Sequence, residues 1–323
     1  MWNAIKPRLT AEEITALVQR GLGVDIPVVE MVEFTDGYFA AAHGVRLADG
    51  RDLVLKVAPG RDTKLLRYEH DIMRTEIHFY ERAGAAGVPL PKMWFADPDA
   101  GVLLVDRLRG RSLHAVKDEL PAADLLALRR EVGACAAAIT RVSGPLFGYP
   151  RQDGRTRSTS WRGSFLAFVD DILADAAELD AELPAPPSQI SAAIRRHAGL
   201  LDQVTTPALL HYDLWDGNVF VVEEDGRWRI EAIIDGERAF YGDPVAELVS
   251  AVHFVDETEA DAVIDGMFGR PLTGDERARL RLYTIYLFLI LVTEGKTRGF
   301  DPVEHEPTRV WALGQLSSLL DAL

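Results

Sequence analysis

Four polar side chains in the second half of the sequence have the types and spacing that phosphoryl transfer needs. His211, Asp213 and Asn218 lie in one polar loop, and Asp235 stands at the end of an apolar run a short way downstream. One carboxylate can accept the proton of an attacking hydroxyl, while an amide oxygen and a second carboxylate can hold magnesium against phosphates. The set therefore indicates transfer of a phosphoryl group to a hydroxyl.

The segments around these residues predict a short hairpin. Residues 209–210, 219–222 and 230–234 are apolar, and Asp225-Gly226 is the strongest short-range signal for a tight turn between two strands. Such a hairpin would bring the polar loop and Asp235 to the same end. Taken alone, the loop is equally well explained as structural, because a His-x-Asp triplet is common.

A lysine in the first half of the chain adds weight to the chemical interpretation. Lys56 lies inside the apolar strand predicted over residues 52–57. A buried ammonium needs a partner or a ligand, since burying it unpaired is very costly. The alternative is an edge position in which the charged end reaches water. A helix predicted over residues 63–83 supplies two acidic candidates for a partner, Glu69 and Glu76.

These motifs occur in an order that resembles a known family. His-x-Asp-x-x-x-x-Asn, then Ile-Asp, then Gly242-Asp243-Pro244 resemble the catalytic and metal-binding loops of the aminoglycoside phosphotransferase-like family, small-molecule relatives of protein kinases. The resemblance covers nearly the whole chain. It implies a two-lobed, protein-kinase-like α+β fold. Residues 1–108 would form a nucleotide-binding lobe with a small antiparallel sheet and one long helix, and residues 109–323 a mainly helical lobe.

The resemblance also implies a place for ATP between the lobes. Adenine would bond to the backbone of Asp106 and Leu108, and the turn at Gly37 would cover the phosphates. Lys56 would hold the phosphates and be steadied by Glu76, about twenty residues further on. Glu69 would then be an ordinary solvated helix charge.

In the second lobe, the resemblance assigns the remaining roles to the polar loop and its neighbour. Asn218 and Asp235 would carry Mg²⁺, and Asp213 would orient the acceptor hydroxyl and take its proton. His211 is expected to brace the loop by hydrogen bonding rather than act as the base. The sequence departs from the family pattern in two places. Tyr212 stands where glycine is common, which affects the packing of the loop. Tyr38-Phe39-Ala40 stand where a small polar residue and an Asn are common after Gly37, which affects the contacts that would cover the phosphates.

The acceptor is expected to be a small hydroxylated molecule, but its class stays open. Carboxylates often bind cationic sugars in the resembled family, and the candidates here are Asp170, Asp171, Glu237 and Glu294, each equally explicable as a surface acid. An aminoglycoside or other antibiotic, and a metabolic sugar or amino alcohol, fit the same catalytic set. A non-catalytic nucleotide-binding protein and an ATP-independent metal hydrolase are the rival classes. The hydrolase would leave Lys56 unexplained.

Composition narrows the partners and the compartment. With 50 acidic and 35 basic residues, the formal net charge is -15, which argues against nucleic acid as the main partner. The single cysteine, Cys135, fits a reducing compartment and reads as a small core residue. The first residues lack the apolar core of a signal peptide, and the apolar stretch 282–292 is too short to span a bilayer. We expect a cytoplasmic protein with no membrane partner.

The remaining segments predict strands early and helices late. Strands are expected over residues 28–34, 39–47, 52–57 and 102–108, after a helix that Thr10 caps and that ends near residue 20. Helices are expected over residues 121–139, 161–179, 188–201, 245–255, 257–268, 275–294 and 308–323. The connection 143–159, with Arg151, Arg155 and Arg157, is expected to be a solvated basic loop, although these side chains could contact phosphate.

Overall fold

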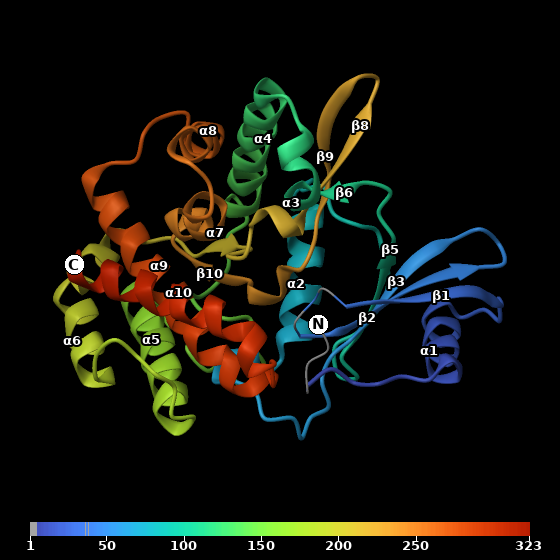
Figure 1. Ribbon diagram of the computed structural model, residues 1–323, viewed down its shortest axis with the longest axis horizontal. Helices are drawn as coiled ribbons and strands as arrows, with labels where there is room; N and C mark the ends of the chain where they lie inside the picture. Colours follow the sequence, from blue (N-terminus) through green and yellow to red (C-terminus); the bar gives the residue numbers. More distant parts are fainter. Residues whose placement is uncertain (1–4, 36, 38) are drawn as a thin grey trace.

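The chain forms two lobes of different composition. The computed structural model describes residues 5–35, 37 and 39–323. Five antiparallel strands in the order β1-β2-β3-β5-β4 make the sheet at the right of Figure 1, and helices fill most of the left. Helix α2 lies between these two parts. This is the kinase-like α+β fold that the sequence predicted.

The smaller lobe combines helices with the five-stranded sheet. In chain order they are α1 (Ala11–Leu22), β1 (Val28–Phe34), β2 (Ala41–Leu47), β3 (Asp52–Val57), the 3-10 turn η1 (Arg67–Glu69), α2 (Ile72–Ala85), β4 (Met93–Asp97) and β5 (Val102–Asp106). Thr10 caps α1 with the predicted reciprocal bonds to Glu13. Gly23, at φ +67°, ends the helix.

The larger lobe is built from helices around two small sheets. Its elements are β6 (Arg111–Ser112), α3 (Leu113–Val116), η2 (Lys117–Glu119), α4 (Ala122–Thr140), α5 (Trp161–Glu178), α6 (Pro187–Arg196), η3 (Ala198–Gln203), β7 (Ala208–Leu210), η4 (Asp216–Asn218), β8 (Val219–Glu224), β9 (Arg227–Ile233), η5 (Gly236–Arg238), β10 (Phe240–Gly242), η6 (Pro244–Glu247), α7 (Leu248–His253), α8 (Glu257–Phe268), α9 (Gly274–Arg298) and α10 (Pro302–Asp321). The sheets have the orders β6-β8-β9 and β10-β7.

Alternation along the strands decides which way Lys56 points. Successive side chains of a strand face opposite sides of the sheet. On β3, Leu55 packs against Val18 of α1, on one face. Its neighbours Val54 and Lys56 therefore face the other side, where α2 lies and where Leu103 of β5 joins the main core. The lysine thus leaves the sheet toward α2.

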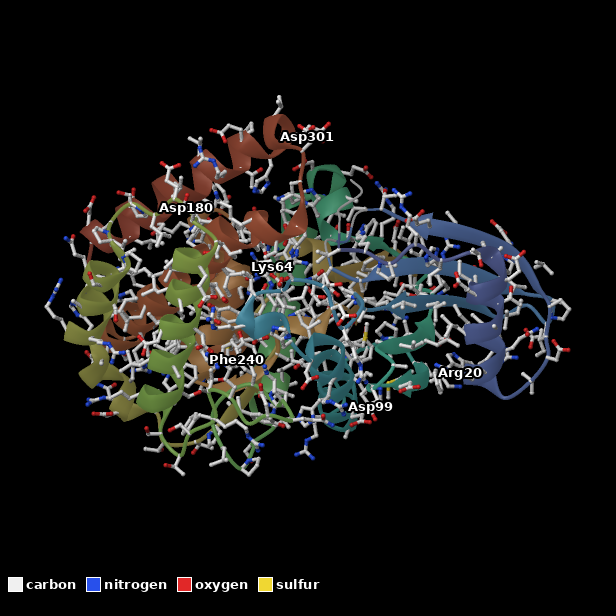
Figure 2. All side chains as sticks on the ribbon, turned by 90° about the horizontal axis from the view of Figure 1, so that it is seen from below. Arg20, Lys64, Asp99, Asp180, Phe240 and Asp301 are labelled. Atoms are coloured by element: carbon white, nitrogen blue, oxygen red, sulfur yellow. The ribbon has the colours of Figure 1, made fainter. Side chains whose placement is uncertain are left out.

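Aromatic side chains form the centre of the larger lobe. Trp161 of α5 stacks on Phe240 with ring centroids 5.8 Å apart, and its Nε1 donates to the hydroxyl of Tyr283 on α9. Phe240 is labelled in Figure 2, where it lies inside the helical lobe. The core reaches β7 and β10, which flank the polar loop of residues 211–218, so the loop rests on a rigid base.

Several elements differ from the sequence-based expectation at their ends. The helix expected over 63–83 begins only at Ile72, because Asp71 adopts φ +63° and the preceding residues form η1. Residues 245–255 form η6 and α7 rather than one helix, residues 188–201 form α6 and η3, and the last helix begins at Pro302. The predicted turn at residues 35–38 includes Asp36 and Tyr38, which lie outside the described residues.

Two charged residues expected to be solvated are buried. Glu69 is 1% exposed, its carboxylate accepts from the Leu66 N–H, and it pairs with Arg298 of α9 at 2.5 Å. Arg151 is 6% exposed and donates to the Arg67 carbonyl. Both expectations were wrong for the same reason: the partners lie far away in sequence. Within the described part of the chain, no helix combines the length and apolar character needed to cross a bilayer.

Candidate active site

Lys56 connects the two lobes through ion pairs. Its Nζ lies 2.6 Å from Glu76 Oε1 on α2 and 2.5 Å from Asp235 Oδ1 in the larger lobe. Burial alone would lower the pKa of Lys56, but Asp235 and Glu76 raise it well above its ordinary value, so the ammonium stays charged. The structure therefore brings three residues together, although the first and the last of them are 179 positions apart in the sequence.

His211 ties the polar loop to the strand end that carries Asp235. Its Nδ1 accepts from the N–H of Asp213 at 3.2 Å, so its Nε2 carries the proton and donates to the carbonyl of Ile234 at 2.8 Å. Burial lowers the pKa of His211, in agreement with this neutral form. Both ring nitrogens are engaged by the backbone, so the geometry fits the bracing role.

Asp213 and Asn218 share one end of the hairpin. Asn218 Nδ2 donates to the Asp213 carbonyl at 2.8 Å and lies 3.4 Å from the Asp213 carboxylate. Burial raises the pKa of Asp213, an effect that the charges of Arg238 and His211 oppose. A carboxylate with a raised pKa is a better proton acceptor, which suits a general base.

Asp235 belongs to a group of acids that could hold a cation. It adopts φ +67° directly after Ile234, and carboxylate oxygens of Glu76, Asp235 and Glu237 lie within 4.8 Å of one another. Asn218 uses its amide nitrogen on Asp213, which leaves its oxygen as the atom to offer a metal. Oxygen donors of this kind are those that Mg²⁺ prefers. The donor set fits the predicted ion and adds Glu237 to it.

The remaining residues predicted to contact the nucleotide lie near the ends of strands. Gly37 is exposed between β1 and β2, with Asp36 and Tyr38 outside the described residues. Asp106 ends β5, and its N–H donates to the Lys92 carbonyl. Leu108 follows in the connection to β6. The contacts of these three positions to a nucleotide stay predictions.

A family comparison agrees with this arrangement. The model of the phosphotransferase enzyme family, APH, matches residues 36–283, which contain every residue predicted for catalysis, nucleotide binding or metal binding. The chain belongs to the APH family. No sequence among curated proteins matches it.

Solved structures of low sequence identity share the fold of this APH-family chain. A protein of Thermobifida fusca YX-ER1, assigned provisionally as a fructosamine-3-kinase, aligns with a TM-score of 0.66 and 22% identity over 96% of this chain and 100% of its own. ADP-bound aminoglycoside phosphotransferase APH(2'')-Ib aligns with a TM-score of 0.64 and 15% identity over 97% and 99%. Macrolide 2'-phosphotransferase type I aligns with a TM-score of 0.61 and 13% identity over 96% and 98%.

Sequence reasoning gave no role to two buried groups of the phosphotransferase. Arg238 lies beside the catalytic loop, with its Nε 3.9 Å from Asp213 Oδ2. Glu247 of η6 accepts from the N–H groups of His211 and Tyr212 at 2.7 and 3.1 Å. Arg238 directly follows the Asp-Gly-Glu triplet that begins at Asp235, and this closeness to a predicted metal ligand was the sequence signal that could have identified it. Nothing in the sequence separates Glu247 from a surface acid.

The four acids considered for substrate binding are not free carboxylates. Three are ion-paired: Asp170 with Arg195, Asp171 with Arg155, and Glu294 with Arg238. Glu237 is buried beside Asp235 instead, and burial together with that neighbouring charge raises its pKa well above the ordinary value. Glu294 was expected at a helix end, whereas α9 continues to Arg298.

Proposed function

We propose that this APH-family phosphotransferase moves the γ-phosphoryl group of ATP to a hydroxyl of a small molecule. The observation that carries the proposal is the bridge from Lys56 to both Glu76 and Asp235, with Asp213 and Asn218 alongside. Complexes with ADP and with ATP among the structural neighbours support the choice of nucleotide. A non-catalytic protein would have no need of this full set.

The nucleotide would lie between a lobe of residues 1–108 and a lobe of residues 109–323. Adenine would bond to the carbonyl of Asp106 and the amide of Leu108, and the turn at Gly37 would cover the phosphates. Lys56, positioned by Glu76, would leave Asp235 and bind the phosphates. The raised pKa of Lys56 keeps the positive charge that this contact needs.

Asn218 and Asp235 would hold Mg²⁺, with Glu237 as a third oxygen donor. The ion would supply positive charge against the phosphate oxygens. Asp213 would accept the proton of the acceptor hydroxyl as the new oxygen–phosphorus bond forms, and His211 would keep the loop in place. ATP supply places this reaction in the cytoplasm.

Two acceptor classes follow from the same catalytic residues. Structural neighbours include complexes of APH(2'')-IIa with streptomycin and gentamicin, which supports an aminoglycoside or another antibiotic and a role in resistance. Asp170, Asp171 and Glu294 are each paired with an arginine, so none of these three acids offers an unpaired carboxylate to a polycation. That observation favours a sugar or amino alcohol.

An ATP-consumption assay over a panel of hydroxylated compounds tests the proposal. The panel should contain aminoglycosides, macrolides, sugars and amino alcohols, each with and without Mg²⁺. At least one compound should stimulate ATP consumption, and Asp213→Ala should abolish the stimulation while ATP still binds. Unchanged turnover in Asp213→Ala would refute the role of the base, and activity without ATP would favour a hydrolase.

A further inference from the structure

Arg238 is a buried cation whose surroundings are more specific than an ion pair requires. It lies on η5, three residues after Asp235, and its side chain is only 9% exposed. The Nη2 atom donates to Glu294 Oε2 at 3.0 Å. The ring of Tyr68 lies 6.0 Å from the guanidinium carbon and closes another side.

A second arginine, Arg298, holds the Glu294 carboxylate in place. Arg298 lies one turn after Glu294 on α9 and contacts the same carboxylate at 3.4 Å. Its guanidinium also pairs with Glu69, at the start of the segment that leads into α2. The Glu294 carboxylate is therefore shared between the two arginines, and Arg298 links it to Glu69. As a result, Arg238 is held in position by elements of both lobes.

Two donors of Arg238 are left over. Its Nε and Nη1 are buried and have no hydrogen-bond partner among the residues that the structure describes. The Asp213 carboxylate is 3.9 Å from Nε, which is too far for a hydrogen bond. A buried donor without a partner costs about 1–3 kcal/mol, so such groups call for an explanation. Of the two, Nε lies beside the Asp213 carboxylate, where the reacting groups would come in the proposed reaction.

We propose that Arg238 is a catalytic residue that binds the phosphoryl group during its transfer. This inference rests on the proposed function. Asp213 contacts the acceptor hydroxyl, so a phosphorus atom bonding to that oxygen comes within reach of a guanidinium beside Asp213. The planar fork of arginine can donate two N–H groups to phosphoryl oxygens. Glu294 and Arg298 act as positioning residues.

The step conserves atoms and charge. The acceptor oxygen forms a bond to the γ-phosphorus, and the bond from that phosphorus to the bridging oxygen of ATP breaks. The electron pair of the broken bond leaves with ADP, and the hydroxyl proton goes to Asp213. Negative charge spreads over the phosphoryl oxygens during this exchange, and an arginine there contributes most at that stage.

A contact to the phosphoryl group and a purely structural ion pair predict different effects of losing Arg238. If Arg238 only supported Glu294 and α9, its loss would weaken the binding of every ligand equally or lower the stability of the protein. If it contacts the moving phosphoryl group, its loss affects only states that contain a phosphoryl group or its mimic. Binding of Mg·ADP alone should then be nearly unchanged.

The experiment compares Mg·ADP with and without aluminium fluoride, a mimic of the phosphoryl group in transfer. The variants are Arg238→Met, which keeps the shape without the charge, and Arg238→Lys, which keeps the charge without the fork. Arg279→Met is the matched control, because Arg279 is also a buried arginine that pairs with a carboxylate: its Nε lies 2.7 Å from Asp243 Oδ2. Binding is measured by calorimetry, and folding of each variant by circular dichroism.

We expect fluoride to tighten ADP binding in the wild type and in Arg279→Met, and to have at most a tenth of that effect in Arg238→Met. Arg238→Lys should lie between them. Saturating turnover should fall on the order of 10³-fold in Arg238→Met with little change in the KM for ATP. An equal fluoride effect in Arg238→Met, or no fluoride effect in a wild type that binds Mg·ADP, would overturn the inference. No Mg·ADP binding by the wild type would instead overturn the proposed function.

Discussion

At the scale of single residues, Glu247 supports the polar loop of residues 211–218. One of its oxygens accepts from the backbone of His211 and Tyr212, and its other oxygen has no partner among the described residues. Burial raises the pKa of Glu247 to about 8, although the two N–H groups oppose the shift. The loop backbone is therefore held by an acid that titrates near neutral pH.

This raised pKa predicts a dependence of stability on pH. Between the ordinary pKa of 4.5 and about 8, the folded state holds a proton on Glu247 that the unfolded state has lost. The contribution of Glu247 to the free energy of unfolding is therefore complete below pH 4.5 and is lost as the pH rises toward 8. The loss is on the order of 1 kcal/mol per pH unit. Glu247→Gln should remove this slope. Urea unfolding at several pH values measures it, and parallel slopes for both proteins would contradict the assignment.

Tyr212 shows why one residue departs from the family pattern without disturbing the site. It adopts φ +67°, the conformation that favours glycine, at a cost of about 1–2 kcal/mol. Its ring is buried 4.9 Å from that of Phe240, and its hydroxyl donates to the Tyr283 carbonyl at 2.8 Å. Burying an aromatic ring of this size contributes about 3–5 kcal/mol, which exceeds the strain.

At the scale of elements, α4 and α8 approach each other through glycines. A Cβ added to Gly133 of α4 would lie 2.1 Å from the carbonyl oxygen of Val263, and one added to Gly266 of α8 would lie 2.2 Å from that of Arg130. Both neighbours are backbone atoms, which cannot rotate away. The packing of α4 against the rest of the larger lobe depends on this close contact.

Gly133→Ala is therefore expected to destabilise the protein despite the higher helix propensity of alanine. Forcing the helices apart should cost at least about 2 kcal/mol. Gly314→Ala is the matched control, since Gly314 is exposed within α10 with open space around it and should gain up to about 1 kcal/mol. Thermal unfolding of both variants tests this. Equal melting temperatures would mean that the helices do not touch at Gly133.

The sequence predicted elements best where local signals were complete. The strand 28–34, the strand 52–57 and the helix 257–268 have their predicted bounds. The turn at Asp225-Gly226 also forms, with φ +53° and +72°. The start of α2 was missed, because a buried pair between Glu69 and Arg298 interrupts a segment of helix-forming residues. No local pattern reveals a partner more than two hundred residues away.

The candidate site shows the same division. Motif spacing located Lys56, Glu76 and Asp235, which the structure brings into direct contact. Arg238 and Glu247 were missed because their importance comes from burial beside the loop, and each resembles an ordinary surface charge in the sequence. Sequence spacing thus revealed residues in motifs, whereas residues that support or surround them required coordinates.

At the scale of the whole molecule, ion pairs join the two lobes, one partly buried and one fully buried. Lys56 reaches from the sheet to Asp235, and Glu69 reaches from the segment before α2 to Arg298. The first pair occupies the groups that would bind phosphate and metal. In the proposed function, nucleotide binding would exchange the bond between Lys56 and Asp235 for bonds to phosphate and Mg²⁺, while the second pair could remain.

Calorimetric titration with a non-hydrolysable ATP analogue, with and without Mg²⁺, tests this exchange most directly. The wild type should bind one analogue in a Mg²⁺-dependent manner, Lys56→Met and Asp235→Asn should each weaken binding at least about tenfold, and Asp213→Asn should change it by less than about threefold. Wild-type affinity in both Lys56→Met and Asp235→Asn would contradict the account, because the nucleotide would then bind elsewhere.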